Sequence, residues 1–326
     1  MTTIKFKNVY IKSDALVVGK KEKEGPLGHY FKNYSYDPYF NQTSYELAEI
    51  EMNRRSVMEC LNKVNLKHPD LIYAGDLLNQ LCTNYLASEL NTPFIGIYGA
   101  CSTSALTIGQ SAIAIEYLNM KNVLALVSSH TQSAERQFRY PNEYGIQRKE
   151  TTTTTVTGSG CVLLSNTPNE LSVTSFTIGK VIDWNFKDVN DMGKAMVPAA
   201  YDTIMTHFKD MNRTFDDYDL VITGDLGKIG YAMLFDMLQE KRFYMNHKLN
   251  DCGIMIYDIN HQDVNCGGSG CACSISVLLS KIFDDLRKKK MKRVLLVATG
   301  SLHNVFLTQQ KQSIPTVAHA ICIERN

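Results

Sequence analysis

The chain has 326 residues, of which 44% are hydrophobic and 21% charged, and its formal net charge is +1. This length and composition predict a globular protein with one large core or two fused halves. Because the charge is close to neutral, we expect no nucleic-acid partner. The longest apolar runs, such as residues 123–127, are far too short to span a bilayer, and residues 1–12 lack the apolar run of a signal peptide.

The nine cysteines are spread along the chain, mostly in apolar contexts. Disulfide frameworks belong to short secreted chains, so we expect reduced and buried thiols here. The cluster of Cys266, Cys271 and Cys273 contains no Cys-x-x-Cys pair, and no histidine lies at ligand spacing. The sequence therefore predicts neither a structural metal site nor a cofactor.

In the first half of the chain, predicted strands alternate with predicted helices. The helix at residues 104–118 is apolar on nearly all sides, so we expect it to be buried from several directions. The predicted strands are 71–75, 94–98, 122–128, 156–165 and 171–182, and the predicted helices are 44–64, 78–90 and 104–118.

The second half shows the same alternation. Pro198 suits the first turn of a helix, and the helix from Ser274 carries an amphipathic apolar stripe. The predicted strands are 219–223, 253–257, 293–299 and 316–323, and the predicted helices are 198–211, 228–240 and 274–289. Strands that alternate with helices predict mostly parallel sheets.

The chain contains an internal repeat, because residues 70–77 (DLIYAGDL) match residues 219–226 (DLVITGDL). Each copy is followed by a glycine, a small-residue turn, a helix, a basic patch and a strand. The offset from the glycine to that strand is the same in both copies. Two such halves that share a helical layer predict a five-layered α/β/α/β/α architecture, and we place the halves at residues 1–182 and 183–326.

A short motif, Gly99-Ala100-Cys101-Ser102-Thr103-Ser104, lies between a predicted strand and the buried helix. A cysteine in the first turn of a buried helix lies where the helix dipole and free amides favour its thiolate. Such a cysteine is a candidate acyl-accepting nucleophile. The free amides of residues 101–103 are also a candidate anion-binding site.

A duplicated α/β half with a cysteine that opens the central helix resembles the thiolase superfamily, which includes thiolases, ketoacyl-ACP synthases and HMG-CoA synthases. Seven motifs narrow the resemblance to the stage V sporulation protein AD family, from about residue 19 to the C-terminus. These motifs are KEGPLG (23–28), AGDLLNQ (74–80), GACSTS (99–104), AERQFRYP (134–141), TVTGSG (155–160), NDCG (250–253) and GGSGCACS (267–274).

The resemblance implies a thiolase-like fold and a role in endospore formation. It implies that the protein binds dipicolinate or its calcium complex and helps to move it into the forespore, alongside membrane proteins of the same spore transport system. It also implies a homodimer formed through the first-half sheet and peripheral association with the spore inner membrane.

The catalytic partners that the superfamily gives to its cysteine look replaced in this chain. The place of the first partner histidine holds Asp225, and the place of the second partner, an asparagine or histidine, holds Ser269. An ionised aspartate cannot donate to an oxyanion, and it disfavours a nearby thiolate. The sequence therefore favours a non-catalytic binder. The alternatives are a divergent thiolase-type acyltransferase that uses Cys101 with His130 or His303, and a purely structural scaffold of a membrane complex.

A dipicolinate site needs donors for two carboxylates, one at each end of a flat ring. Arg136 and Arg139, in a predicted loop after the strand at 122–128, can each hold a carboxylate with two hydrogen bonds. Surface ion pairs with Glu135 and Glu143 are the alternative for these arginines. The predicted ligand-binding residues are Cys101, Ser102, His130, Arg136, Arg139, Asp225 and Ser269.

Two aspartates follow equivalent strands in the two halves. Asp76 and Asp225 are both candidate helix caps, and for Asp76 we favour that interpretation, because aspartate is a preferred cap. If the ligand is the calcium chelate, these aspartates can instead contact the metal ion.

Overall fold

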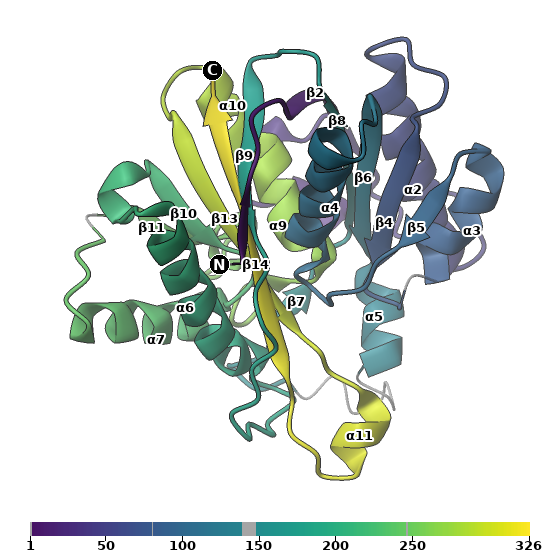
Figure 1. Ribbon diagram of the computed structural model, residues 1–326. Coiled ribbons are helices and arrows are strands. Elements are labelled where there is room, and N and C mark those ends of the chain that lie inside the picture. The colour runs from purple at the N-terminus through teal and green to yellow at the C-terminus, as the bar shows by residue number, and fades with distance from the viewer. Residues whose placement is uncertain (1, 80, 139–147, 246) are drawn as a thin grey trace.

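The computed structural model describes residues 2–79, 81–138, 148–245 and 247–326. The chain folds into two halves of similar topology whose sheets lie on either side of a central helical layer (Figure 1). The two sheets are joined by one backbone pair, between Tyr10 and Ser172. The predicted five-layered α/β architecture is confirmed.

The first-half sheet has the strand order β2-β8-β6-β4-β5. Strand β4 runs parallel to β5 and β6, whereas β8 runs antiparallel to both β6 and β2. The bounds are β2 Tyr10–Val18, β4 Leu71–Asp76, β5 Phe94–Gly96, β6 Asn122–Ser129 and β8 Gly158–Ser165.

The second-half sheet repeats this arrangement in the order β9-β14-β13-β10-β11. Strand β10 runs parallel to β11 and β13, and β14 runs antiparallel to both β13 and β9. The expectation of mostly parallel sheets is therefore wrong, because the last strand of each half returns antiparallel to its neighbours. The bounds are β9 Leu171–Thr177, β10 Leu220–Thr223, β11 Leu249–Asp251, β13 Arg293–Ser301 and β14 Thr316–Arg325.

The sequence repeat has a structural counterpart at the start of β4 and β10. One carboxylate oxygen of Asp70 accepts hydrogen bonds from the amides of Lys121 and Asn122, at 2.7 and 3.0 Å. Asp219 does the same for Lys292 and Arg293, at 2.7 and 2.9 Å. Strand β9, which the predicted boundary at residue 182 assigns to the first half, occupies the place in the second sheet that β2 occupies in the first.

Helices form the other three layers (Figure 1). Helices α2 (Tyr45–Asn62) and α3 (Leu81–Leu90) cover the outer face of the first sheet, and α6 (Met192–Met211) and α7 (Gly227–Glu240) cover the outer face of the second. The central layer contains α4 (Thr103–Tyr117) and α9 (Cys271–Val277), and α9 continues through a π-helical turn at Leu278–Ile282 into α10 (Phe283–Arg287). Because α4 contacts strands of both sheets, it is buried from several directions, as predicted.

Short elements fill the connections between these layers. They are β1 Thr3–Lys5, α1 Lys20–Lys23, η1 Gly28–Tyr30, β3 Asn33–Tyr34, α5 Thr131–Phe138, β7 Thr154–Thr155, η3 Phe215–Asp217, α8 Cys252–Ile256, β12 Gly268–Ser269 and α11 Val305–Gln309.

The start of one predicted helix and the type of one predicted strand are wrong. Helix α6 begins at Met192, and Pro198 lies inside it; the side chain of Asp191 caps the helix by accepting from the amide of Lys194 at 3.2 Å. The predicted strand at residues 253–257 is mostly helix α8, which Asp251 caps in the same way through the amide of Ile254. A short apolar run does not distinguish a strand from a helix. Here the capping hydrogen bond of Asp251 favours the helix.

The central helix α4 contacts the second half at a glycine. A Cβ added to Gly109 would lie 2.4 Å from the ring of Phe176 on β9. Phe176 is fully buried. The absence of a side chain at Gly109 therefore allows α4 and β9 to approach each other closely.

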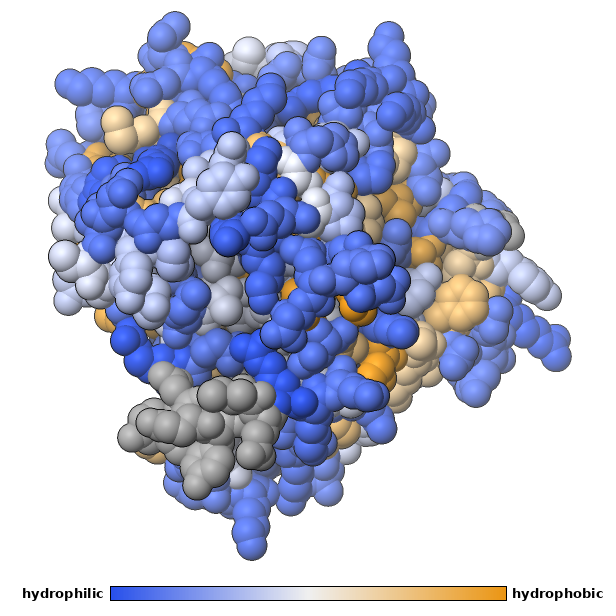
Figure 2. Space-filling view, turned by 180° about the vertical axis from the view of Figure 1, so that it is seen from behind, coloured by the Kyte–Doolittle hydropathy of each residue, from blue (hydrophilic) through white to orange (hydrophobic). Residues whose placement is uncertain are grey.

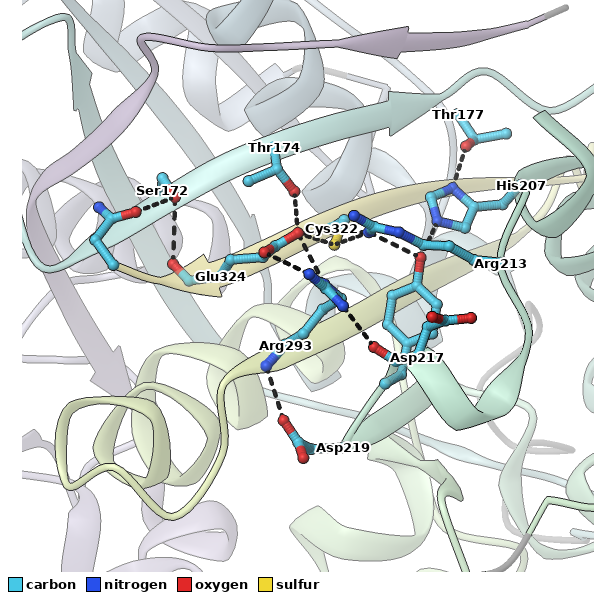
Figure 3. Close-up of polar contacts among 12 residues, drawn as sticks. Ser172, Thr174, Thr177, His207, Arg213, Asp217, Asp219, Arg293, Cys322 and Glu324 are labelled. Atoms are coloured by element: carbon cyan, nitrogen blue, oxygen red, sulfur yellow. Dashed lines mark hydrogen bonds and ion pairs between the residues drawn. The ribbon is translucent and has the colours of Figure 1, made fainter. Parts of the chain in front are cut away.

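A polar network crosses the outer part of the second sheet (Figure 3). Glu324 on β14 accepts from Nη2 of Arg293 at 3.0 Å and from the hydroxyl of Thr174 at 3.0 Å, and it forms an ion pair with Arg213 at 3.4 Å. These contacts join strands β13, β14 and β9 to the residue that follows α6 and its cap. The network contributes to the packing of the second half and lies apart from the cavities described below.

The molecular face in Figure 2 is mostly hydrophilic, and apolar side chains form small separate patches on it. Single exposed apolar residues are normal on protein surfaces. Within the described part of the chain, no helix has both the length and the apolar character needed to cross a membrane.

Candidate functional site

Cys101 lies in a tight turn between β5 and α4. The helix begins at Thr103 with Ser102 as its N-cap, so Cys101 precedes the helix instead of standing in its first turn. The preceding residue, Ala100, has a φ of 49°, which is uncommon for a residue with a side chain. Strained backbone of this kind is typical of functional sites.

The expected anion site at the amides of residues 101–103 is wrong for two of the three. The amide of Ser102 donates to the carbonyl of Gly99 at 3.1 Å, and the amide of Thr103 donates to the carbonyl of Ala100 at 3.2 Å. The tight turn uses these donors itself. They are therefore not available to a ligand.

A narrow cavity opens above Cys101, with a volume of about 40 Å³. We call it the Cys101 cavity. It combines apolar walls with a polar floor, and it is lined by Leu77, Tyr98, Cys101, Ala134, Glu135, Phe138, Thr153, Thr155, Met192, Met196, Asp225, Ser269, Ser301 and His303.

The Cys101 thiol donates a hydrogen bond to the carboxyl group of Asp225. Burial, together with this nearby carboxyl group, raises the pKa of the Cys101 thiol well above its ordinary value. The environment therefore holds the group as a thiol, whereas an isolated helix N-terminus would favour the thiolate. The structure places Cys101 where a nucleophile would stand but disfavours its ionised form.

Asp225 is held from three sides. Its two carboxyl oxygens accept from the hydroxyl of Thr299 at 2.7 Å and from the amide of Gly270 at 3.1 Å, besides the thiol of Cys101. Burial raises the pKa of Asp225 to about 7, although these hydrogen bonds act in the opposite direction. Near neutral pH, Asp225 can thus be either a neutral acid or a carboxylate.

The equivalent residue of the first half has a different role. Asp76 accepts from the amide of Thr83 at 2.9 Å and from its hydroxyl at 3.1 Å, which ties it to the first turn of α3. In the second half, Asp251 accepts from the amides of Leu226 and Gly227 at the start of α7. Asp225 is thereby left to line the cavity.

The structure brings four of the sequence-derived candidates together, since Cys101, Asp225, Ser269 and His303 line the same cavity. Ser102 is buried, and its hydroxyl donates to the carbonyl of Gly99 at 2.6 Å. His130 lies outside the described lining, where its Nε2 is 2.8 Å from the carbonyl oxygen of Pro38.

Arg136 is not in a loop, because residues 131–138 form helix α5. Its side chain is half exposed, forms an ion pair with Glu46, and lines a second and larger cavity. The structure therefore does not bring Arg136 together with Cys101. Arg139 and Glu143 lie outside the described residues.

Sequence reasoning missed the wall residues that α5 and α6 supply. Ala134, Glu135 and Phe138 come from α5, and Met192 and Met196 come from the first turns of α6. Because the predicted helix begins at residue 198 and α6 begins at Met192, the two methionines were not identified as cavity residues. Residues 131–138 have a strong apolar periodicity, which is the signal that would have identified α5 as a helix.

The charge inside the Cys101 cavity is acidic. Glu135 and Asp225 line it, and no lysine or arginine stands among its described lining residues. No group of three or more His, Cys, Asp or Glu residues in the described chain is arranged to hold a metal ion. The described lining therefore offers no charge that would attract an anion.

One protein family matches nearly the whole chain. The family model for Stage V sporulation protein AD (SpoVAD) matches residues 1–324. Stage V sporulation protein AD of Bacillus subtilis (strain 168) is 48% identical over 320 residues, which cover 97% of this chain and 94% of that protein.

The solved structures that resemble the chain are thiolase-like. 3-Oxoacyl-(acyl-carrier-protein) synthase III from Aquifex aeolicus VF5 is 13% identical, with a TM-score of 0.59 over 97% of this chain and 99% of that chain. OleA from Xanthomonas campestris, bound with cerulenin, is 12% identical, with a TM-score of 0.61 over 97% of both chains. At such identities the likeness shows the fold alone.

Proposed function

The chain belongs to the stage V sporulation protein AD family, whose members act in sporulation, and from this premise we propose that it is a non-catalytic binder of dipicolinate. In this proposal the Cys101 cavity takes the calcium chelate of dipicolinate. The protein aids uptake of dipicolinate into the forespore, at the spore inner membrane and together with membrane proteins of the same transport system.

The observation that carries this proposal is the acidic lining of the cavity. Free dipicolinate has two negative charges, which an ionised Asp225 would repel, and no described lining residue is a cation that would attract them. In the chelate, calcium balances these charges, and the ligand fills several calcium positions through its own oxygens and nitrogen. A single carboxylate such as Asp225 can then complete the coordination, because calcium prefers oxygen ligands.

The lining of the cavity supports an aromatic ligand. Its volume of about 40 Å³ is small, and its walls include the rings of Tyr98 and Phe138 and the side chain of Met196. Apolar walls with a few polar groups are typical of small-molecule sites. This volume is smaller than the about 150 Å³ that accommodates a benzene ring, so these walls must move apart before dipicolinate can enter with its carboxylate end at Asp225 and Ser269.

Acyl transfer is the second candidate, and one observation favours it: His303 lines the same cavity as Cys101. A catalytic cysteine needs a thiolate, which the neighbouring Asp225 and burial disfavour. We therefore expect iodoacetamide to leave Cys101 unmodified at pH 7.5 in the folded chain, as followed by mass spectrometry. Rapid modification at Cys101, together with acylation by an acyl-CoA, would instead establish the acyltransferase.

Calorimetry with dipicolinate in excess calcium chloride tests the binding proposal. We expect one chelate per chain in the Cys101 cavity, and we expect Asp225→Asn to weaken it about tenfold, which corresponds to about 1.4 kcal/mol. Cys101→Ala removes no ligand oxygen and should change the affinity much less. The matched control is Asp183→Asn, since Asp183 is exposed and outside the cavity lining.

Absence of heat at millimolar chelate would rule out this proposal. A chain that binds neither the chelate nor an acyl-CoA would be the scaffold of a membrane complex. Equal affinities for wild type and Asp225→Asn would place the chelate elsewhere on the molecule.

A further inference from the structure

A second cavity lies on the other side of helix α5, and we call it the outer cleft. Its volume is about 890 Å³, far larger than that of the Cys101 cavity. Glu135 lines both cavities. The outer cleft is lined by Gly19, Lys20, Lys21, Glu22, Glu24, Tyr36, Pro38, Tyr45, Thr131, Gln132, Glu135, Arg136, Arg148, Thr157, His261, Gln262 and Asp263.

The cations of the outer cleft are only weakly neutralised. The ammonium group of Lys21 donates to the carbonyl oxygen of Asp263 at 3.0 Å, and that contact leaves its charge uncompensated. Lys20 is 3.9 Å from Glu24, and both side chains are largely exposed. Exposed pairs contribute about 0–1 kcal/mol, so an incoming carboxylate can replace them at little cost.

Both arginines of the cleft have a carboxylate partner, which a ligand carboxylate would have to displace. The side chain of Arg136 is half exposed, and its ion-pair partner is Glu46. Arg148 lies 3.7 Å from Glu135, in a contact longer than a good hydrogen bond. Guanidinium groups bind carboxylates with two parallel hydrogen bonds, which a lysine cannot provide.

Glu22 provides a buried polar group in the same cleft. It is only 1% exposed, and its Oε1 accepts from the amide of Thr157 at 2.9 Å and from the hydroxyl of Tyr257. Its Oε2 has no hydrogen-bond partner among the described residues. Burial raises the pKa of Glu22, which favours its neutral form and so reduces the repulsion of an anion in the cleft.

Aromatic side chains complete the lining. Tyr36 is 56% exposed, and the ring of Tyr45 stacks on that of Tyr39 with centroids 4.5 Å apart. Flat exposed rings next to arginines favour an aromatic ligand with anionic groups. The lining also includes acidic residues, but unlike the described lining of the Cys101 cavity it contains lysines and arginines.

We propose that the outer cleft is a second ligand site, which binds an aromatic dicarboxylate in its metal-free, dianionic form. The identity of that ligand as dipicolinate rests on the function proposed above. The two sites then bind the two forms of one compound: cations and tyrosines hold the free dianion in the outer cleft, and acids hold the calcium chelate in the Cys101 cavity. Glu135 lies at the boundary between them.

Calorimetry on the full chain separates the two sites. One arm uses dipicolinate in buffer freed of divalent cations by a chelating resin, and the other uses dipicolinate with excess calcium chloride. The variants are Lys21→Gln and Arg136→Gln in the outer cleft, and Asp225→Asn in the Cys101 cavity. The matched control is Lys180→Gln, a largely exposed lysine paired with Asp202 and absent from both linings.

In the metal-free arm we expect one dianion per chain, with the affinity lowered about tenfold by Arg136→Gln and also lowered by Lys21→Gln. Added sodium chloride should weaken it as well, because salt screens exposed charges. Neither outer-cleft variant should change binding of the chelate. Lys180→Gln should match the wild type in both arms.

Three results would overturn this proposal. They are the absence of metal-free binding, metal-free binding that Arg136→Gln and Lys21→Gln leave unchanged, and displacement of dipicolinate by an equal concentration of inorganic phosphate. If the chelate binds but the dianion does not, the result supports the proposed function and rules out the second site. If the dianion binds in the outer cleft but the chelate does not bind, the result supports the second site and rules out the proposed site at Cys101.

Discussion

At the scale of single residues, the two halves use equivalent aspartates for different purposes. Asp76 accepts from the amide and hydroxyl of Thr83, whereas Asp225 contacts Thr299, Gly270 and the thiol of Cys101. In the second half, Asp251 accepts the hydrogen bonds from the amides at the start of α7, so Asp225 is not needed there. This exchange of partners turns a structural carboxyl group into one that faces a cavity.

The raised pKa of Asp225 predicts a pH dependence of stability. Its folded pKa of about 7 exceeds the ordinary value of 3.8, so the folded state binds the proton more tightly than the unfolded state. The resulting stabilisation is fully present below pH 4 and is lost as the pH rises towards 7. We expect the unfolding free energy of Asp225→Asn, measured by urea denaturation, to fall less between pH 5 and pH 8 than that of wild type.

Other buried acids also contribute to this slope, because burial raises the pKa of Glu49 to about 8. The variant should therefore flatten the slope without abolishing it. Asp183→Asn is the control, since its pKa is lowered and it titrates outside this range. Identical slopes for wild type and Asp225→Asn would contradict a raised pKa at Asp225.

At the scale of elements, the central helix α4 determines how closely the two halves pack. Most of its residues are buried, and it contacts strands of both sheets. A helix buried on all sides has little free space for added atoms, because protein interiors are close-packed. Gly109 is the position where this restriction is strongest, since Phe176 leaves no space for a Cβ.

We expect Gly109→Ala to destabilise the protein by about 1–3 kcal/mol through overpacking against Phe176. The higher helix propensity of alanine contributes about 1 kcal/mol in the opposite direction, so the clash determines the sign. Thermal and urea unfolding measure the effect. Combining the change with Phe176→Leu should recover part of the loss, and a stable Gly109→Ala single variant would show that α4 and β9 can separate at no cost.

The network around Glu324 is the second element-scale feature. Glu324 faces the guanidinium groups of both Arg213 and Arg293, and all three side chains are largely buried (Figure 3). Burial alone would raise the pKa of Glu324, but its bonds with Arg293 and Thr174 hold it below the ordinary value. The carboxylate thus remains charged between two cations.

We expect Glu324→Gln to lower the unfolding free energy by about 1–3 kcal/mol, because two partly buried arginines lose their counter-charge. Urea denaturation at pH 7 measures this change. Removing the exposed partner of Asp202 with Lys180→Gln should cost less than about 0.5 kcal/mol. Equal effects of the two substitutions would mean that the network contributes no more than a surface ion pair.

At the scale of the whole molecule, each sheet ends in a short strand, β5 in the first half and β11 in the second. Strand β5 lies at the free edge of the first sheet, and Ile95 at its centre is 46% exposed. A free strand edge is a template for pairing with another strand. This is where a homodimer through the first-half sheet would form.

We expect light scattering after size-exclusion chromatography to give the mass of a dimer, and Ile95→Lys to give a monomer, because paired edges would bring the new charges together. Val181→Lys, at an exposed apolar site next to the second sheet, is the matched control and should remain dimeric. A monomeric wild type, or dissociation by Val181→Lys alone, would contradict the β5 interface.

Some of the fold could be predicted because its signals are local in the chain. The match between DLIYAGDL and DLVITGDL marked the duplication, and the apolar character of residues 104–118 marked the central helix. The starts of α6 and α8 escaped prediction, because an aspartate cap determined each boundary while the apolar residues suggested another. The antiparallel return of β8 and β14 has no local signal, since strand direction depends on how the connections pass over the sheet.

The sequence by itself determined the duplicated α/β fold, the family and the position of Cys101, since these depend on periodicity and on short motifs. Only the tertiary structure decided which candidates meet: Cys101, Asp225, Ser269 and His303 share a cavity, while Arg136 lines another. It also decided the protonation of the thiol. Burial and a neighbouring carboxyl group set the pKa of Cys101, and both arise from residues far apart in the chain that packing brings together.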